Sequence, residues 1–166
     1  MMRRNLLYLI IGMSMMFSSC QNRMAYSHYE STPVRGWECN DTLLFDVPPI
    51  QEAGYYEEVV GLRINGDYPF MGLDLVVRQM VLPSQETYID TLVCNLVDEA
   101  GHTLGRGVNH YQYQLPLTTL KLNKGDSLHI TIHHCMKREI LPGISDVGLE
   151  LSRQVSTSVQ TKENKK

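Results

Sequence analysis

The chain contains six histidines, a residue type that often binds metal ions. His133 and His134 are neighbours in a predicted strand, so their side chains point to opposite faces. His129 and His133 share a face, but at about 3.3 Å per residue they lie ~13 Å apart. One ion with zinc–nitrogen bonds of about 2.1 Å cannot hold both. His102 and His110 fall in predicted loops. We therefore interpret the histidines as solvated polar side chains, and we predict no metal and no cofactor.

Other catalytic patterns are also weak. The glycines of Gly101-x₃-Gly105-Arg-Gly107 lack the Gly-Lys-Ser/Thr ending of a phosphate loop, and no predicted helix follows them. A sharp loop backbone explains them better. No Ser, His and Asp set has motif context, and Gly-x-Ser-x-Gly is missing. Carboxylates are scattered, as on a solvated face: Asp41, Asp46, Glu57 and Glu58. A carboxylate-pair hydrolase stays open as an alternative, but we predict that the protein is not an enzyme.

Four cysteines are present: Cys20, Cys39, Cys94 and Cys135. The last three are 55 and 41 residues apart, whereas a zinc site usually contains a closely spaced Cys pair. One disulfide among these three is possible, and the sequence does not separate the pairings. The alternative is that all three are unpaired, partly buried small hydrophobes.

A short positive segment and an apolar run open the chain. Arg3 and Arg4 precede 12 uncharged residues, 6–17. As a helix this run would reach about 18 Å, less than the roughly 30 Å of a bilayer core. It predicts a cleaved secretory signal over residues 1–19.

The apolar run ends in Phe17-Ser18-Ser19-Cys20. This ending resembles a bacterial lipobox, in which the Cys thiol is diacylated and becomes the new N-terminus. Phe17 stands where Leu is usual. The sequence thus predicts lipidation at Cys20, with acyl chains such as palmitate anchoring the protein to a lipid bilayer. An ordinary cleaved signal, with Cys20 an incidental thiol, is the alternative.

Removal of residues 1–19 would leave 147 of the 166 residues, enough for one domain. The net charge would go from −3 to −5, because Arg3 and Arg4 are lost with no acid. A mildly acidic chain without a basic cluster argues against nucleic acid as a partner. We expect a tether over 20–25, a folded domain over 26–152 and a disordered tail over 153–166, which is rich in Ser, Thr, Gln and Lys.

Hydrophobic side chains alternate with a period of two through most of the chain. Turn formers separate the alternating runs. The pattern predicts an all-β fold, an antiparallel β-sandwich of the jelly-roll-like or Ig-like kind. We expect Tyr88–Val97 to be a central strand, because β-branched residues occupy both of its faces. The predicted strands are Thr42–Val47, Tyr55–Asn65, Met71–Leu82, Tyr88–Val97, Ser127–Lys137 and Asp146–Ser152.

Three triplets match Asp-Ser/Thr-apolar and resemble the O-glycosylation acceptor of Bacteroidetes envelope proteins. Their acceptor residues would be Thr42, Thr91 and Ser127. The same triplets are also good strand starts, so a purely structural role is the alternative.

The order of several short motifs resembles one known family. These motifs are Trp37-x₃-Asp41-Thr42-Leu43-x-Phe45, Leu62-Arg63-x-Asn65-x₂-Tyr68-Pro69-Phe70-x₂-Leu73, Asp98-x₂-Gly101-x₃-Gly105-x-Gly107 and Leu141-x-Gly143-Ile144-x-Asp146-Val147-Gly148-Leu149. Behind a lipobox, this order is similar to the GldH family, the gliding-motility-associated lipoproteins of Bacteroidetes. Gly72, where the family usually has Asn, and Lys137 depart from its pattern. The resemblance implies lipidation and a link to gliding and its secretion machinery, with no cofactor and no catalytic residues.

Within this framework Leu62 and Leu73 are expected in the core, and Arg63 is expected to pair with Glu57 or Asp67. We expect the protein to act through contacts with other envelope proteins. Aromatic-rich loops at Trp37, Tyr55-Tyr56 and Tyr111-x-Tyr113 would provide the contact points. A glycan-binding module that stacks sugars on these aromatics is the alternative.

The residues after Cys20 also bear on the location of the protein. Gln21-Asn22-Arg23 lacks the acidic residues that resemble a surface-export signal in this phylum. This favours an outer-membrane position facing the periplasm.

Overall fold

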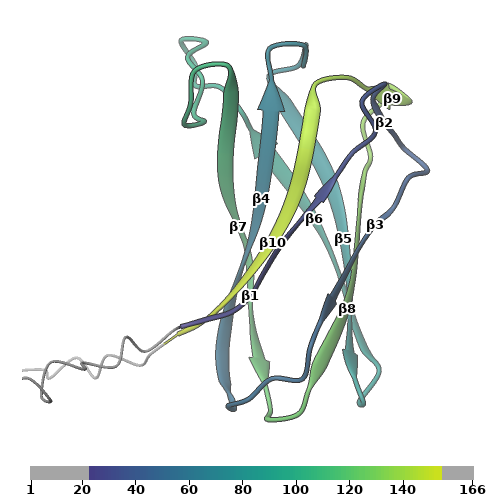
Figure 1. The fold of residues 1–166 in the computed structure, drawn as a ribbon, viewed down its shortest axis with the longest axis vertical. Helices are drawn as coiled ribbons and strands as arrows, with labels where there is room; N and C mark the ends of the chain where they lie inside the picture. Colours follow the sequence, from purple (N-terminus) through teal and green to yellow (C-terminus); the bar gives the residue numbers. More distant parts are fainter. Residues whose placement is uncertain (1–22, 155–166) are drawn as a thin grey trace, which may run out of the picture.

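The computed structural model describes residues 23–154, most of which form two antiparallel four-stranded sheets packed face to face (Figure 1). The first sheet consists, in spatial order, of β1 (Met24–Ser31), β10 (Ile144–Arg153), β4 (Gly54–Asn65) and β7 (His110–Leu122). The second consists of β3 (Leu43–Val47), β8 (Ser127–His134), β5 (Gly72–Leu82) and β6 (Glu86–Asn95). A ribbon of β2 (Trp37–Glu38) and β9 (Ile140–Leu141) lies at the upper end. The predicted antiparallel sandwich is confirmed.

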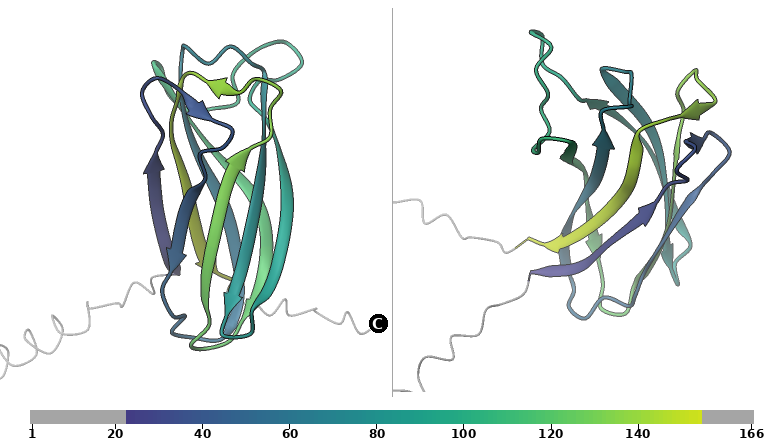
Figure 2. Two further views of the ribbon diagram at one scale, coloured as in Figure 1. Left: turned by 90° about the vertical axis from the view of Figure 1, so that its right-hand side faces the viewer. Right: turned by 45° about the horizontal axis from the view of Figure 1, so that its top comes forward.

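The connectivity distinguishes between the two kinds of sandwich that the sequence left open. Apart from the ribbon, the first sheet contains the first, eighth, third and sixth strands of the chain. The second sheet contains the second, seventh, fourth and fifth. Eight strands that alternate between two sheets in this order form a jelly roll. Figure 2 shows the successive crossings between the sheets at the two ends of the molecule.

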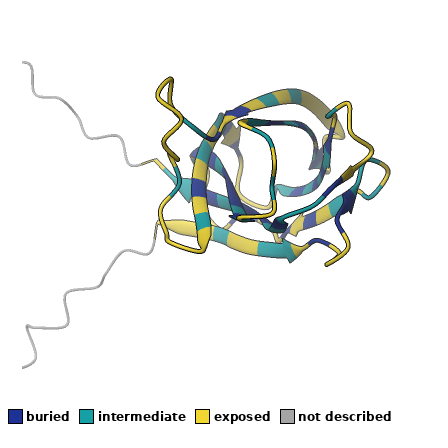
Figure 3. Cartoon of the chain, turned by 90° about the horizontal axis from the view of Figure 1, so that it is seen from above, coloured by how far each residue is buried: buried dark blue, intermediate teal, exposed yellow. Residues whose placement is uncertain are grey.

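The core lies between the two sheets and follows from strict alternation along the strands. In β8, Leu128, Ile130 and Ile132 are buried, while His129 and the other intervening residues are partly exposed. Figure 3, viewed along the sandwich, shows buried and exposed residues alternating along the strands. Leu62 of β4 and Leu73 of β5 are fully buried, as predicted.

The predicted strands agree with the observed ones to within a few residues. The largest difference is at β8, which ends at His134 rather than at Lys137. The strands recovered in this way are β3, β4, β5, β6, β8 and β10.

The predicted position of β6 is wrong. We expected a central strand, but β6 pairs only with β5 and forms an edge of its sheet. Ile89 and Val93 remain 64% and 65% exposed on its outer face. Their branched side chains suit the strand conformation without being buried, so composition alone gave a misleading signal.

Strands β1 and β7 were not predicted. The residues of β1 show no apolar alternation. In β7, Tyr113 and Leu115 face inward at odd positions, whereas Leu120 and Leu122 do so at even positions. The register of β7 against β4 shifts between Glu57 and Val59, and such an irregularity reverses the inward phase of the following residues.

The first and last described strands lie side by side. Met24 pairs with Ser152, and the Arg153 amide donates to the Arg23 carbonyl oxygen across 2.8 Å. Both strands therefore begin or end at the same side of the sandwich (Figure 1). Residues 24 and 25 belong to β1 rather than to the expected tether. The predicted signal, Cys20 and nearly all of the predicted tail fall outside the described residues.

Candidate functional site

The predicted modification sites differ in how they are presented. Cys20 lies outside the described residues. Thr42 is exposed just before β3, and Thr91 is exposed in the middle of β6. Ser127 begins β8, is only partly exposed and pairs with Leu82. Exposure therefore favours Thr42 and Thr91 over Ser127 as acceptors.

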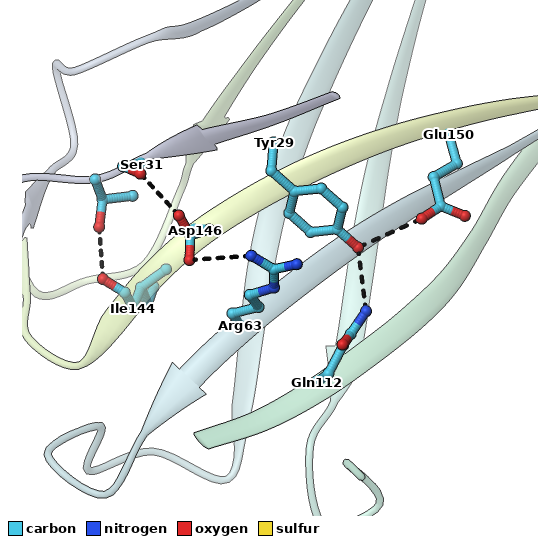
Figure 4. Close-up of polar contacts among 8 residues, drawn as sticks. Tyr29, Ser31, Arg63, Gln112, Ile144, Asp146 and Glu150 are labelled. Carbon is cyan, nitrogen blue, oxygen red and sulfur yellow. Dashed lines mark hydrogen bonds and ion pairs between the residues drawn. The ribbon is translucent and has the colours of Figure 1, made fainter. Parts of the chain in front are cut away.

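A polar cluster covers the outer face of the first sheet (Figure 4). Its centre is Tyr29 of β1, which lies flat across Gly61 of β4 and Gly148 of β10. A Cβ atom on Gly148 would be 2.5 Å from the Tyr29 ring, closer than real contacts allow. Because the two glycines have no side chains, the aromatic ring packs directly against the backbone of β4 and β10.

Arg63 joins this cluster from β4. Its guanidinium carbon is 4.3 Å from the centroid of the Tyr29 ring, a cation–π geometry. Its Nη1 is 3.8 Å from Oδ2 of Asp146, and the other carboxylate oxygen of Asp146, Oδ1, accepts a 2.8 Å hydrogen bond from the Ser31 hydroxyl. Arg63 therefore pairs with an acid, as predicted, but that acid is Asp146 rather than Glu57 or Asp67. Asp146 is the partner because β10 pairs with β4 at that register.

The other side of the Tyr29 ring has polar partners too. The Tyr29 hydroxyl donates to Glu150 over 3.5 Å and accepts from Gln112 Nε2 over 3.4 Å. Burial raises the pKa of Tyr29, and the Glu150 carboxylate adds to this rise. The cluster links four strands through these hydrogen bonds and the ion pair. These contacts, which we call the Tyr29 clamp, hold edge strand β1 on the sheet.

Trp37 does not lie in an exposed loop, which corrects our expectation. The side chain is fully buried, because the β2–β9 ribbon folds over the end of the sandwich. Its Nε1 donates to the Asp41 carbonyl oxygen at 2.8 Å. His134 packs edge-on against the indole with 5.2 Å between centroids, and its Nε2 donates to the Trp37 carbonyl oxygen at 3.1 Å. Trp37 and His134 pack together and close the upper end of the core.

The other aromatic residues that were predicted to contact partners include both buried and exposed side chains. Tyr56 and Tyr113 are core residues, 3% and 7% exposed. Tyr55 is 54% exposed, and Tyr111 is half-buried against the core. All four tyrosines lie in strands β4 and β7 rather than in loops, and Tyr55 is the well-exposed ring among them. Glycan binding stays an untested alternative.

A buried polar pair occupies the core. Glu58 of β4 and Gln79 of β5 are fully buried, and their side-chain polar atoms have no hydrogen-bond partner of good geometry. Burial raises the pKa of Glu58 to about 7, opposed by the Gln79 amide and assisted by Asp90. We expected Glu58 on a solvated face with the other carboxylates. The expectation was wrong because Glu58 falls on the inward phase of β4.

The histidines do not converge. Within residues 23–154, no three His, Cys, Asp or Glu side chains are placed to hold a metal ion. His129 pairs with Asp46 at 2.6 Å on the exposed face, as expected of a solvated residue. His134 is the exception, because it is buried beneath Trp37. No helix in the described part of the chain is long and apolar enough to cross a bilayer.

The three described cysteines are free thiols. Cys94 is buried, Cys39 is intermediate and Cys135 is exposed. Burial raises the pKa of Cys94 to about 12, with a further contribution from Asp74. The structure therefore agrees with the alternative in which all three cysteines are unpaired, rather than with a disulfide.

The open edge of β6 differs from the other sheet edges. Strand β3 has only five residues, β1 has an irregular register near Met24, and β7 contains Pro116 and the shift opposite Glu57. Such features discourage pairing with another chain. Strand β6 has ten residues in continuous register, with no Pro, Lys or Arg. Its charged residues are the two acids Glu86 and Asp90, its outer edge pairs with no other described strand, and Ile89 and Val93 are exposed beside that edge.

The strand order and the two packed sheets define an antiparallel jelly-roll domain. The model of the GldH lipoprotein family matches residues 24–151, and the chain belongs to this family. One relative is the gliding motility lipoprotein GldH homolog of Christiangramia forsetii, 23% identical over 88% of this chain and 94% of its own length. Another is the gliding motility lipoprotein GldH of Flavobacterium johnsoniae, 25% identical over the same shares.

Solved structures give only a distant likeness. A family GH115 4-O-methyl-alpha-glucuronidase, BtGH115A, matches 82% of this chain and 18% of its own, with 12% identity and a TM-score of 0.42.

Proposed function

We propose that the protein is a membrane-anchored lipoprotein of the cell envelope that works without catalysis, by binding other envelope proteins. The lipid would be attached at Cys20, and the domain would face the periplasm from the outer membrane. Membership of the GldH family and the names of its relatives support this role. The proximity of the β1 start to the β10 end supports attachment at one pole of the sandwich, which leaves the rest free for partners.

The observation that carries the binding role is the open edge of β6. An extended segment of a partner can add to such an edge as a further strand, because its backbone groups bond to the free backbone groups of the edge. Ile89 and Val93 are four residues apart on one face of β6, with Thr91 between them, and would contact alternate side chains of the added segment. The partner is therefore an envelope protein with an exposed extended segment, within the gliding or secretion machinery.

The test combines site-specific cross-linking with amide exchange. A photoreactive residue in place of Val93 should cross-link to the same envelope protein in repeated experiments. The same residue in place of Leu44, which is exposed on the opposite edge of the same sheet, should not. Binding of that protein should slow hydrogen exchange at β6 amides. Equal adducts at both positions, or unchanged exchange in β6, would reject strand addition.

Anchoring and location have their own test. The full chain should incorporate labelled palmitate and fractionate with outer membranes, and Cys20→Ala should abolish both. Protease should reach the domain only after the outer membrane is opened. Digestion in intact cells would contradict the periplasmic orientation.

A further inference from the structure

A pocket lies at the end of the sandwich where β1 begins and β10 ends. Its volume is about 380 Å³, within the range of small-molecule sites. Three separate segments line it: the start of β1, the β3–β4 loop and Arg153 of β10, with Tyr56 at its inner wall. The apolar part of the lining is contributed by Met24, Ala25, Pro48, Pro49, Ile50 and Tyr56.

Most polar side chains around this pocket, with the exception of Arg23, are already engaged by the protein. The Tyr56 hydroxyl donates to the Glu52 carbonyl oxygen at 2.7 Å, and Gln51 donates to the Pro49 carbonyl oxygen at 3.0 Å. Arg153 bonds to the Glu52 carboxylate and to the Ala53 carbonyl oxygen. Few polar groups therefore remain to recognise a polar ligand. The larger part of the pocket surface is apolar, which favours an apolar ligand.

The position of the pocket relative to Cys20 identifies that ligand. Arg23 lines the pocket and lies three residues after Cys20. Three residues span at most about 10 Å. An extended acyl chain spans about half of a bilayer core, or roughly 15 Å. A chain carried by Cys20 thus reaches the pocket without any rearrangement of the described strands.

We propose that this pocket binds one acyl chain of the lipid carried by the protein's own Cys20. The inference rests on the lipidation proposed above. The pocket would shelter one chain from water whenever the lipid is out of the bilayer, and it would hold the domain close to the membrane surface when the remaining chains are inserted.

The experiment uses the full chain, expressed in cells fed a fatty acid that carries a photoreactive diazirine. After irradiation, digestion and mass spectrometry should locate cross-links on the peptides that contain Met24 and residues 48–52. Ala25→Trp should fill the pocket and lower these cross-links at least several-fold. Ser27→Trp, on the same strand but outside the pocket, should leave them unchanged.

Gln51→Trp provides a second way to fill the pocket from an exposed loop, should Ala25→Trp disturb β1. If the label enters the protein but cross-links only to phospholipid, or if both Trp variants cross-link like the unmodified chain, the pocket assignment is wrong and the anchor stands. If no label enters the protein, the anchor and the pocket assignment both fail. Pocket cross-links that persist in Cys20→Ala would assign the pocket to a bilayer lipid and overturn the proposal.

Discussion

The guanidinium carbon of Arg63 lies 4.3 Å from the centre of the Tyr29 ring, and this contact joins strands β4 and β1 across the intervening β10. The ring fits against the sheet only because Gly61 and Gly148 have no side chains. Edge strand β1 is therefore held by side chains as well as by its backbone ladder. This clamp gives the motif positions Arg63 and Gly148 a structural meaning.

Gly148→Ala should destabilise the domain by about 1–3 kcal/mol, because the new methyl group overlaps the Tyr29 ring. Urea unfolding measures this loss. Gly66→Ala is the matched control, since a Cβ atom at Gly66 meets nothing within 4 Å, and its effect should stay within about 0.5 kcal/mol. In a Tyr29→Ala background Gly148→Ala should cost much less. Simple additivity of the two changes would contradict the clamp.

Trp37→Ala should cost about 3–5 kcal/mol, because it empties the upper end of the core. Tyr55→Ala removes an exposed ring and should change the free energy of unfolding by no more than about 0.5 kcal/mol. Denaturant midpoints of the two variants compare them directly. Similar midpoints would contradict the buried position of Trp37 at the upper end of the core.

The stability of the domain should fall as the pH rises from about 4.5 to 7. The pKa of Glu58 is raised to about 7 in the folded state, so the folded state binds more protons than the unfolded state in this window. The loss approaches roughly 3 kcal/mol. Burial lowers the pKa of His134 and acts in the opposite sense, because stability is lost as the pH falls below its ordinary value of 6.5.

Glu58→Gln separates these two effects. The variant keeps a neutral side chain of similar size, so the Glu58 contribution should vanish and only the rise with pH from His134 should remain. Urea unfolding at pH 5 and pH 8 of both proteins provides the comparison. The same fall in stability in Glu58→Gln would assign the pH dependence to other groups.

Thiol labelling should follow burial. With iodoacetamide under native conditions, Cys135 should react first and Cys39 more slowly, while Cys94 should stay protected until unfolding because burial raises its pKa to about 12. Mass spectrometry after timed quenching gives the order. A species resistant to labelling even after unfolding, but labelled after reduction, would show a disulfide instead.

Modification of Thr91 would affect the same surface as partner binding. Thr91 lies between Ile89 and Val93 on β6, so a glycan there would cover the proposed strand-addition edge. Glycopeptide analysis of protein from the native envelope should find any glycan at Thr42 or Thr91 before Ser127. Full occupancy of Ser127 with the other two sites bare would contradict the ranking by exposure.

Sequence patterns predicted the strands whose alternation is regular and whose inner face is apolar, such as β5 and β8. They failed at β7, where the bulge opposite Glu57 changes the phase. They also misplaced β6, because β-branched residues are common on exposed edges as well as in central strands. Trp37 and Arg63 were misassigned for a different reason. Trp37 pairs with Leu141 of β9, about 100 residues along the chain, and Arg63 pairs with Asp146 of β10, about 80 residues along it, and no local pattern encodes such contacts.

The antiparallel pairing of β1 with β10 has a mechanical consequence. A pull on residue 23 from a bilayer, resisted by a partner held at β6, acts along the axis of β1. Hydrogen bonds between antiparallel strands are perpendicular to that axis, so the whole β1–β10 ladder is loaded in shear instead of opening one bond at a time. With the anchor proposed at Cys20, the domain would transmit tension from the start of β1 to the second sheet.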